Sequence, residues 1–177
     1  MACDLNGYSC EGVGALASAA IAVFAFVVTV WQAGVTRKHN RLSVKPFLNT
    51  WSEASEGSGV YEIRLNNIGI GPAIIESFEI RVDDKKVEGN GLDVISYAVK
   101  AMFPSNAPPV LFKSCLAKGG ALGAGEGITL VRIKFAPQTM PTSDEFESMK
   151  KRIRLTVKYK SIYKEETYTY DSTLDHQ

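Results

Sequence analysis

The feature that most constrains this chain is an uncharged, apolar stretch of 25 residues near its N-terminus, residues 12–36. A helix of that length extends about 37 Å, enough to cross a hydrocarbon core of about 30 Å with some tilt. Its centre, residues 21–28, is apolar on every face, whereas a surface helix of a soluble protein carries a polar stripe. The preceding residues include Asp4 and Glu11 but no Lys or Arg, unlike the basic start of a secretory signal peptide. We therefore predict one transmembrane helix over residues 12–36.

Basic residues follow this stretch directly, in a predicted juxtamembrane linker, residues 37–45. They are Arg37, Lys38, Arg41 and Lys45. Lys and Arg beside a span stay on the cytoplasmic side of the membrane. We therefore expect a single-pass membrane protein with an extracytoplasmic tail, residues 1–11, and a cytoplasmic domain, residues 46–177. Cys3 and Cys10 fall in the tail, where an oxidising compartment permits a disulfide, and the sequence leaves open whether they pair.

Small residues recur every three or four positions along the predicted span and fall on one helix face. They are Gly14, Ser18, Ala22, Ala25, Thr29 and Ala33. A stripe of small residues lets two helix backbones approach closely inside a membrane, where lipid provides no hydrophobic force between helices. The stripe favours a homo-oligomer, or packing against a partner helix. The alternative is a chance pattern, because small residues make up about half of the span.

The remainder of the chain alternates apolar and polar residues with the period of half-buried strands. The clearest runs are residues 47–51, 61–65, 78–82, 128–135, 153–159 and 167–171, and we expect a polar loop over residues 52–59. Helical spacing of apolar residues predicts a short helix over residues 92–103. Thr142 and Glu145 form a capping box that predicts a second helix, to about Lys151. The fold class we predict is mainly β, with six or seven strands in an immunoglobulin-like β-sandwich, or alternatively a small open β-barrel.

Three segments together resemble a family of small, uncharacterised bacterial single-pass membrane proteins. They are the run Arg-Lys-His-Asn-Arg-Leu-Ser-Val-Lys-Pro at residues 37–46, Asn-Ile-Gly-Ile-Gly-Pro-Ala at 67–73, and Tyr-Lys-Ser-Ile-Tyr at 159–163. The resemblance implies a bacterial inner-membrane protein and carries no catalytic residue over to this chain.

The residues offer little support for catalysis. The two histidines, His39 and His176, lie far apart in the sequence, and the chain has no metal-ligand spacing and no nucleophile motif. We therefore expect no enzyme, no cofactor and no metal. A net charge of +1 also argues against bulk nucleic-acid binding.

A row of basic side chains on one predicted strand face is the candidate anion-binding surface. It consists of Arg152, Arg154, Lys158 and Lys160. Such a row suits an anionic ligand or lipid headgroups. The alternative is a solvated strand face that Glu165 and Glu166 partly neutralise.

The sequence thus favours a membrane-anchored, non-enzymatic binding or regulatory module that faces the cytoplasm. The alternatives are a ligand-triggered effector that acts on the membrane, for example in phage defence, and an accessory subunit of a membrane complex. The sequence identifies no ligand and no protein partner.

Overall fold

The structure is a computed structural model that describes residues 10–55, 58–104, 107–136, 139–163 and 166–173. It divides into a helical unit that ends at Leu42 and a β domain that begins at Ser43. The helical unit is α1 (Cys10–Leu42). Within the described residues, α1 is the one helix that is long and apolar enough to cross a membrane. It continues past the predicted span through the basic residues at 37–41 and ends four positions before Pro46.

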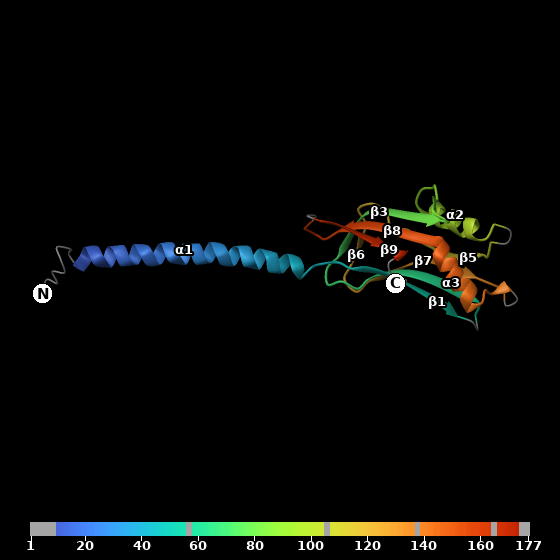
Figure 1. Cartoon of the computed structure of the whole chain (residues 1–177), viewed down its shortest axis with the longest axis horizontal. Helices are drawn as coiled ribbons and strands as arrows, with labels where there is room; N and C mark the ends of the chain where they lie inside the picture. The colour runs from blue at the N-terminus through green and yellow to red at the C-terminus, as the bar shows by residue number, and fades with distance from the viewer. Residues whose placement is uncertain (1–9, 56–57, 105–106, 137–138, 164–165, 174–177) are drawn as a thin grey trace. The chain divides into compact units, whose positions relative to one another are not determined.

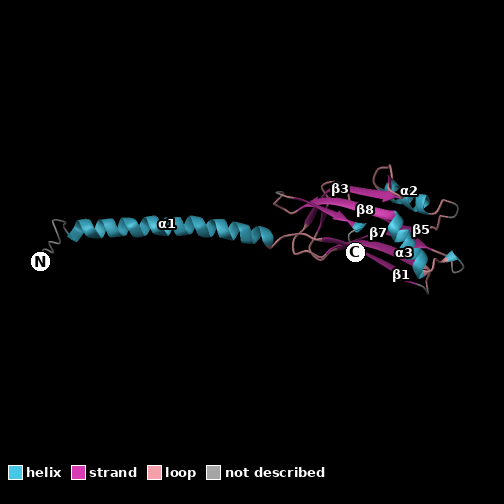
Figure 2. Ribbon diagram, viewed as in Figure 1, coloured by secondary structure: helices cyan, strands magenta, loops and turns pink. Residues whose placement is uncertain are grey.

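The β domain contains two antiparallel sheets. The first has the strand order β1 (Leu48–Ser55), β2 (Val60–Asn67), β7 (Gly127–Lys134) and β5 (Val110–Lys113). The second has the order β4 (Lys85–Lys86), β3 (Ala73–Val82), β8 (Ile153–Lys160) and β9 (Thr167–Asp171), and β6 (Ala121–Leu122) also pairs with β3. Figures 1 and 2 show the strands of the two sheets running along the domain. The predicted mainly β sandwich with short helices is confirmed.

The core is made by the inward residues of both sheets, as the alternation predicts. On β8, Leu155, Val157 and Tyr159 are all buried. Two α-helices complete the described part of the domain: α2 (Leu92–Met102), which contacts β3 and β5, and α3 (Ser143–Arg152), which contacts β8. The capping box at Thr142 is present at the start of α3. Both predicted short helices are therefore confirmed.

Several boundaries differ from the predictions. Residues 52–55 continue β1 instead of starting a loop, because they pair with β2 as far as Ser55 and Val60. The alternation does not reveal β5, since neighbouring Leu111 and Phe112 on this edge strand are both exposed. The short β6 lies inside a glycine-rich segment whose sequence carries no strand alternation. The described residues therefore form nine strands rather than six or seven.

The turn after β2 carries the chain from the first sheet to the second and is organised by the buried side chain of Asn67. Its Oδ1 accepts from the backbone N–H groups of Phe47 and Gly69, at 3.1 Å each. Its Nδ2 donates to the carbonyls of Gly71 at 2.8 Å and of Leu122 and Gly123 at 3.0 Å. One side chain therefore ties together the segment before β1, the turn itself and the end of β6.

The segment before β1 lies directly on this turn. Ile68 donates its backbone N–H to the carbonyl of Phe47, and Ile70 donates to that of Lys45. A Cβ atom at Gly71 would collide with the backbone of Val44, and one at Gly69 with the backbone that leads into β1. Both glycines are thus required by the close approach of two backbones.

Candidate functional site

The candidate functional site is a cavity of about 530 Å³ between the two sheets, at the end of the domain where α2 and α3 pack. Pockets that bind small molecules in proteins have volumes of about 300–1,000 Å³ and mostly apolar walls. The wall here combines residues of both sheets and both helices, chiefly Tyr61, Ile80, Ala98, Met102, Leu130, Phe135, Phe146 and Leu155. The cavity thus has the size and the wall chemistry of a small-molecule site.

Aromatic contacts hold one side of this wall in place. The ring of Phe146, from α3, stacks on Tyr61 of β2 with 4.8 Å between ring centroids. It also meets Phe135, after β7, edge-on at 5.9 Å. Phe103, at the end of α2, contacts Phe135 in the same manner at 5.6 Å. Because these rings come from four separate elements, the wall forms only when the domain is folded.

Polar groups also line the cavity, beside β1 and α3. Ser172 accepts from the N–H of Leu155 at 2.9 Å, and Lys150 pairs with Glu147 at 2.7 Å. Asn49 is different. It alternates with the inward-facing Thr50 and Ser52, so its side chain lies on the other face of β1, and its buried Oδ1, which has no hydrogen-bond partner among the described residues, does not contribute an acceptor to the cavity.

Tyr61 supplies a hydroxyl to the cavity wall. Burial is the main cause that raises the pKa of Tyr61 above its ordinary value, while a hydrogen bond with Ser52 and the positive charge of Lys150 act in the opposite direction. The phenol is therefore neutral at physiological pH. In the described parts of the chain, no group of three His, Cys, Asp or Glu side chains could hold a metal ion.

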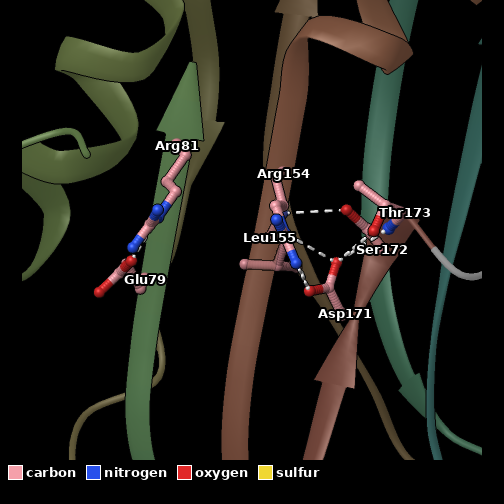
Figure 3. Close-up of polar contacts among 7 residues, drawn as sticks. All are labelled: Glu79, Arg81, Arg154, Leu155, Asp171, Ser172 and Thr173. Atoms are coloured by element: carbon pink, nitrogen blue, oxygen red, sulfur yellow. Dashed lines mark hydrogen bonds and ion pairs between the residues drawn. The ribbon is translucent and has the colours of Figure 1, made fainter. Parts of the chain in front are cut away.

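The predicted basic row does not form one uninterrupted strand face. Arg152 is the last residue of α3, and the other three members lie on β8. Three of its four cations form ion pairs with carboxylates. Arg152 pairs with Asp83 at 2.6 Å, and Arg154 pairs with Asp171 at 2.5 Å. Lys160 pairs with Glu76 at 2.7 Å. Figure 3 shows the Arg154 guanidinium pointing at the Asp171 carboxylate across the two strands. Within the described residues, Lys158 has no ion-pair partner.

These carboxylates are not the ones that the sequence suggested. Glu165 lies outside the described residues, and within them Glu166 forms no ion pair. The hydrogen bond from Arg154 is the main cause that lowers the pKa of Asp171, and Lys160 likewise lowers the pKa of Glu76. Both carboxylates therefore stay ionised at neutral pH and cancel much of the field of the row. Anion binding at this surface remains a prediction.

The remaining predicted site residues belong to or follow α1. All six small residues of the stripe, and Arg37, Lys38 and Arg41, lie on this helix and are exposed, while Lys45 belongs to the β domain. The Thr29 hydroxyl donates to the Ala25 carbonyl at 2.7 Å, so this polar member of the stripe is satisfied within the helix. The Lys45 ammonium lies 5.3 Å from the ring centroid of Tyr168.

The sequence did not predict the cavity. Its wall residues look like ordinary core positions in the sequence, because alternation identifies the inward face of a strand but not the distance to the facing sheet. One signal was present. Polar Thr50 and Ser52 occupy the inward positions of β1, opposite Leu65 and Ile63, where a fully packed sandwich would place apolar residues.

A family model described as a domain of unknown function (DUF8453) matches residues 13–177, which include nearly all of α1 and the whole β domain. No curated protein and no solved structure matches the chain.

Proposed function

The chain belongs to the DUF8453 family, and we propose that it is a non-enzymatic binding module anchored in a bacterial inner membrane by α1, with its β domain in the cytoplasm. Anchoring is supported by the length and composition of α1. The orientation is supported by the basic residues at its C-terminal end, since Lys and Arg beside a span stay cytoplasmic.

The observation that carries the binding function is the cavity between the sheets. Its wall suits an apolar small molecule, and the inward-facing Ser52 and the hydroxyl of Tyr61 suit a polar group on that molecule. The ligand class is therefore a small, mainly apolar compound that carries a hydroxyl or amide group. Burying such a compound needs no charged partner, which agrees with the neutral phenol of Tyr61 in the wall.

A matched pair of substitutions on α2 tests this function. Ala98 is buried and lines the cavity, whereas Ala101 on the same helix is exposed. Ala98→Phe places a ring in the cavity, and Ala101→Phe adds the same ring outside it. The full chain in nanodiscs is titrated with n-decanol while thermal unfolding is followed by circular dichroism.

A ligand that binds only the folded state raises Tm, by about 5–10 °C at a concentration one hundred times its Kd. We expect this rise for the parent and for Ala101→Phe, and its loss for Ala98→Phe. Effects of the alcohol on the bilayer are common to all three proteins and cancel in the comparison. An equal rise for Ala98→Phe, or no rise for the parent, would reject the cavity as the binding site.

A further inference from the structure

A second surface of the β domain gathers exposed apolar side chains at the end opposite the cavity. The register places three turns there. Ile74, just after the turn that follows β2, pairs with Lys160, the last residue of β8, and with Ala121 of β6. The turn after β2, the turn after β8 and the segment around β6 are therefore neighbours at one end of the sandwich, as Figure 1 shows.

Large apolar residues at this end point into solvent. They are Phe47, Ile68, Ile70, Ile162 and Tyr163, each between 45% and 68% exposed. Single exposed apolar residues are common on protein surfaces, but a group of them marks a surface that contacts another molecule or a membrane. The backbone hydrogen bonds from Ile68 to Phe47 and from Ile70 to Lys45 hold the first three of these residues together. We call these five residues the apolar tip.

Two exposed basic residues lie on segments next to the apolar tip. The carbonyl of Lys45 accepts from Ile70, and Lys118 precedes Gly119, which donates to Ile75; Lys160 is half-buried and paired with Glu76. An apolar centre with cations around it matches the interface of a bilayer with anionic headgroups, because the apolar groups enter the acyl boundary while the ammonium groups meet phosphates. A protein partner that buries such a surface would have to provide acidic groups around an apolar pocket.

Chain connectivity favours the bilayer over a protein partner. Only Ser43 and Val44 separate Leu42, the last residue of α1, from Lys45, whose carbonyl accepts from Ile70. A residue spans at most about 3.6 Å of extended chain, so a membrane that holds α1 keeps the apolar tip within short reach of its surface. The Asn67 hydrogen bonds fix the turn to this same segment.

We propose that the apolar tip docks on the surface of the membrane that holds α1, with its apolar side chains in the headgroup boundary and Lys45 and Lys118 against anionic lipid. Docking would restrain the β domain at the bilayer through two attachments, the covalent helix and this tip. The proposal rests on membrane anchoring by α1 and is independent of the cavity's ligand.

The test compares two exposed apolar positions at opposite ends of the domain. Ile70→Cys lies in the apolar tip, and Leu111→Cys, on β5 and 53% exposed, is its matched control. In both, Cys3, Cys10 and Cys115 are replaced by Ser. The full chain is reconstituted into vesicles of equal parts phosphatidylglycerol and phosphatidylcholine, and the cysteine is labelled from outside with the dye NBD. Some phosphatidylcholine carries a nitroxide quencher near the top of its acyl chain.

We expect quenching at residue 70 to exceed that at residue 111 by at least about twofold, because only the tip enters the region that holds the quencher. Ile162→Cys, on the neighbouring turn, should behave like Ile70→Cys. Equal or absent quenching at both ends, with the protein floating together with the vesicles, would overturn docking alone. A blue-shifted dye at residue 70 that the lipid quencher does not reach would mean a protein contact and would also overturn it. Failure of the full chain to float with vesicles would overturn anchoring, and docking with it.

Discussion

Replacing Asn67 by Ala should destabilise the β domain far more than the same exchange at the neighbouring Asn66. The side chain is fully buried and makes five hydrogen bonds to backbone groups of three segments. A hydrogen bond contributes about 1 kcal/mol net, and a buried group left without a partner costs about 1–3 kcal/mol. Two N–H groups and three carbonyls lose their partner in Asn67→Ala.

The sum of five bonds is about 5 kcal/mol, and water entering the emptied turn lowers this figure. We therefore expect Asn67→Ala to cost about 3–5 kcal/mol, a large part of the roughly 5–15 kcal/mol that holds a typical domain together. Asn66→Ala is the matched control. Asn66 precedes Asn67 on β2, is half-buried and forms no hydrogen bond through its side chain within the described residues, so its loss should cost below about 1 kcal/mol.

The measurement is urea unfolding of both variants in the full chain in detergent micelles, followed by near-ultraviolet circular dichroism. Amide hydrogen exchange provides a local readout, since the N–H groups of Phe47 and Gly69 should lose protection in Asn67→Ala. The reasoning would be wrong if Asn67→Ala and Asn66→Ala cost the same, or if those two amides stayed protected.

Three further predictions address topology, packing and charge. A C-terminal alkaline phosphatase fusion should be inactive and a fluorescent protein fusion bright, because the basic residues after the span keep the domain in the cytoplasm. An active phosphatase fusion would mean that the orientation is the opposite one. The double substitution Ser18→Leu and Ala22→Leu should weaken self-association in a membrane two-hybrid assay, and unchanged association would make the stripe a chance pattern. Acidification should lower Tm below about pH 4. The pKa of Asp171 in the folded protein is lowered, chiefly by the hydrogen bond from Arg154. The stability that this carboxylate contributes is therefore present above its pKa in the unfolded chain, and it is lost as the pH falls through its pKa in the folded protein. Asp171→Asn should flatten this fall in Tm, whereas the control Asp93→Asn, at an exposed position, should not. Equal slopes of Tm against pH in the two variants would exclude the ion pair as the cause.

The strands and helices with a regular apolar period could be predicted from the sequence, because that period reports directly which side of an element is buried. The run from Ile153 to Tyr159 shows this on β8, and the capping box at Thr142 located the start of α3 within one residue. Edge strands lack that signal. On β5 neither Leu111 nor Phe112 is buried, so the hydrogen bonds to β7 define a strand that the side chains do not indicate.

The contacts between distant segments could not be predicted in the same way. The partner of Arg154 lies 17 residues away across one hairpin, and the register between β8 and β9 would have located Asp171 once the turn was placed. The partner of Arg152 lies 69 residues away in the turn between β3 and β4, and no local pattern points to Asp83. In the sequence, Asn67 is only the first residue of the segment Asn-Ile-Gly-Ile-Gly-Pro-Ala at 67–73. Its role depends on which backbones cross there, which is a property of the folded domain.

Folding alone explains the ion pairs of the basic row, but it does not explain the cavity. Ion pairs on the row contribute modestly to the fold and need no ligand to account for them. The cavity differs, because packing within the domain leaves its mainly apolar wall accessible. Ala98→Phe buries apolar surface against that wall and should therefore raise the unfolding free energy of the unliganded protein while it removes decanol binding, as expected where a site is maintained at the expense of stability. A lower stability for Ala98→Phe than for Ala101→Phe would mean that the space is already filled by packing and that the cavity is no site.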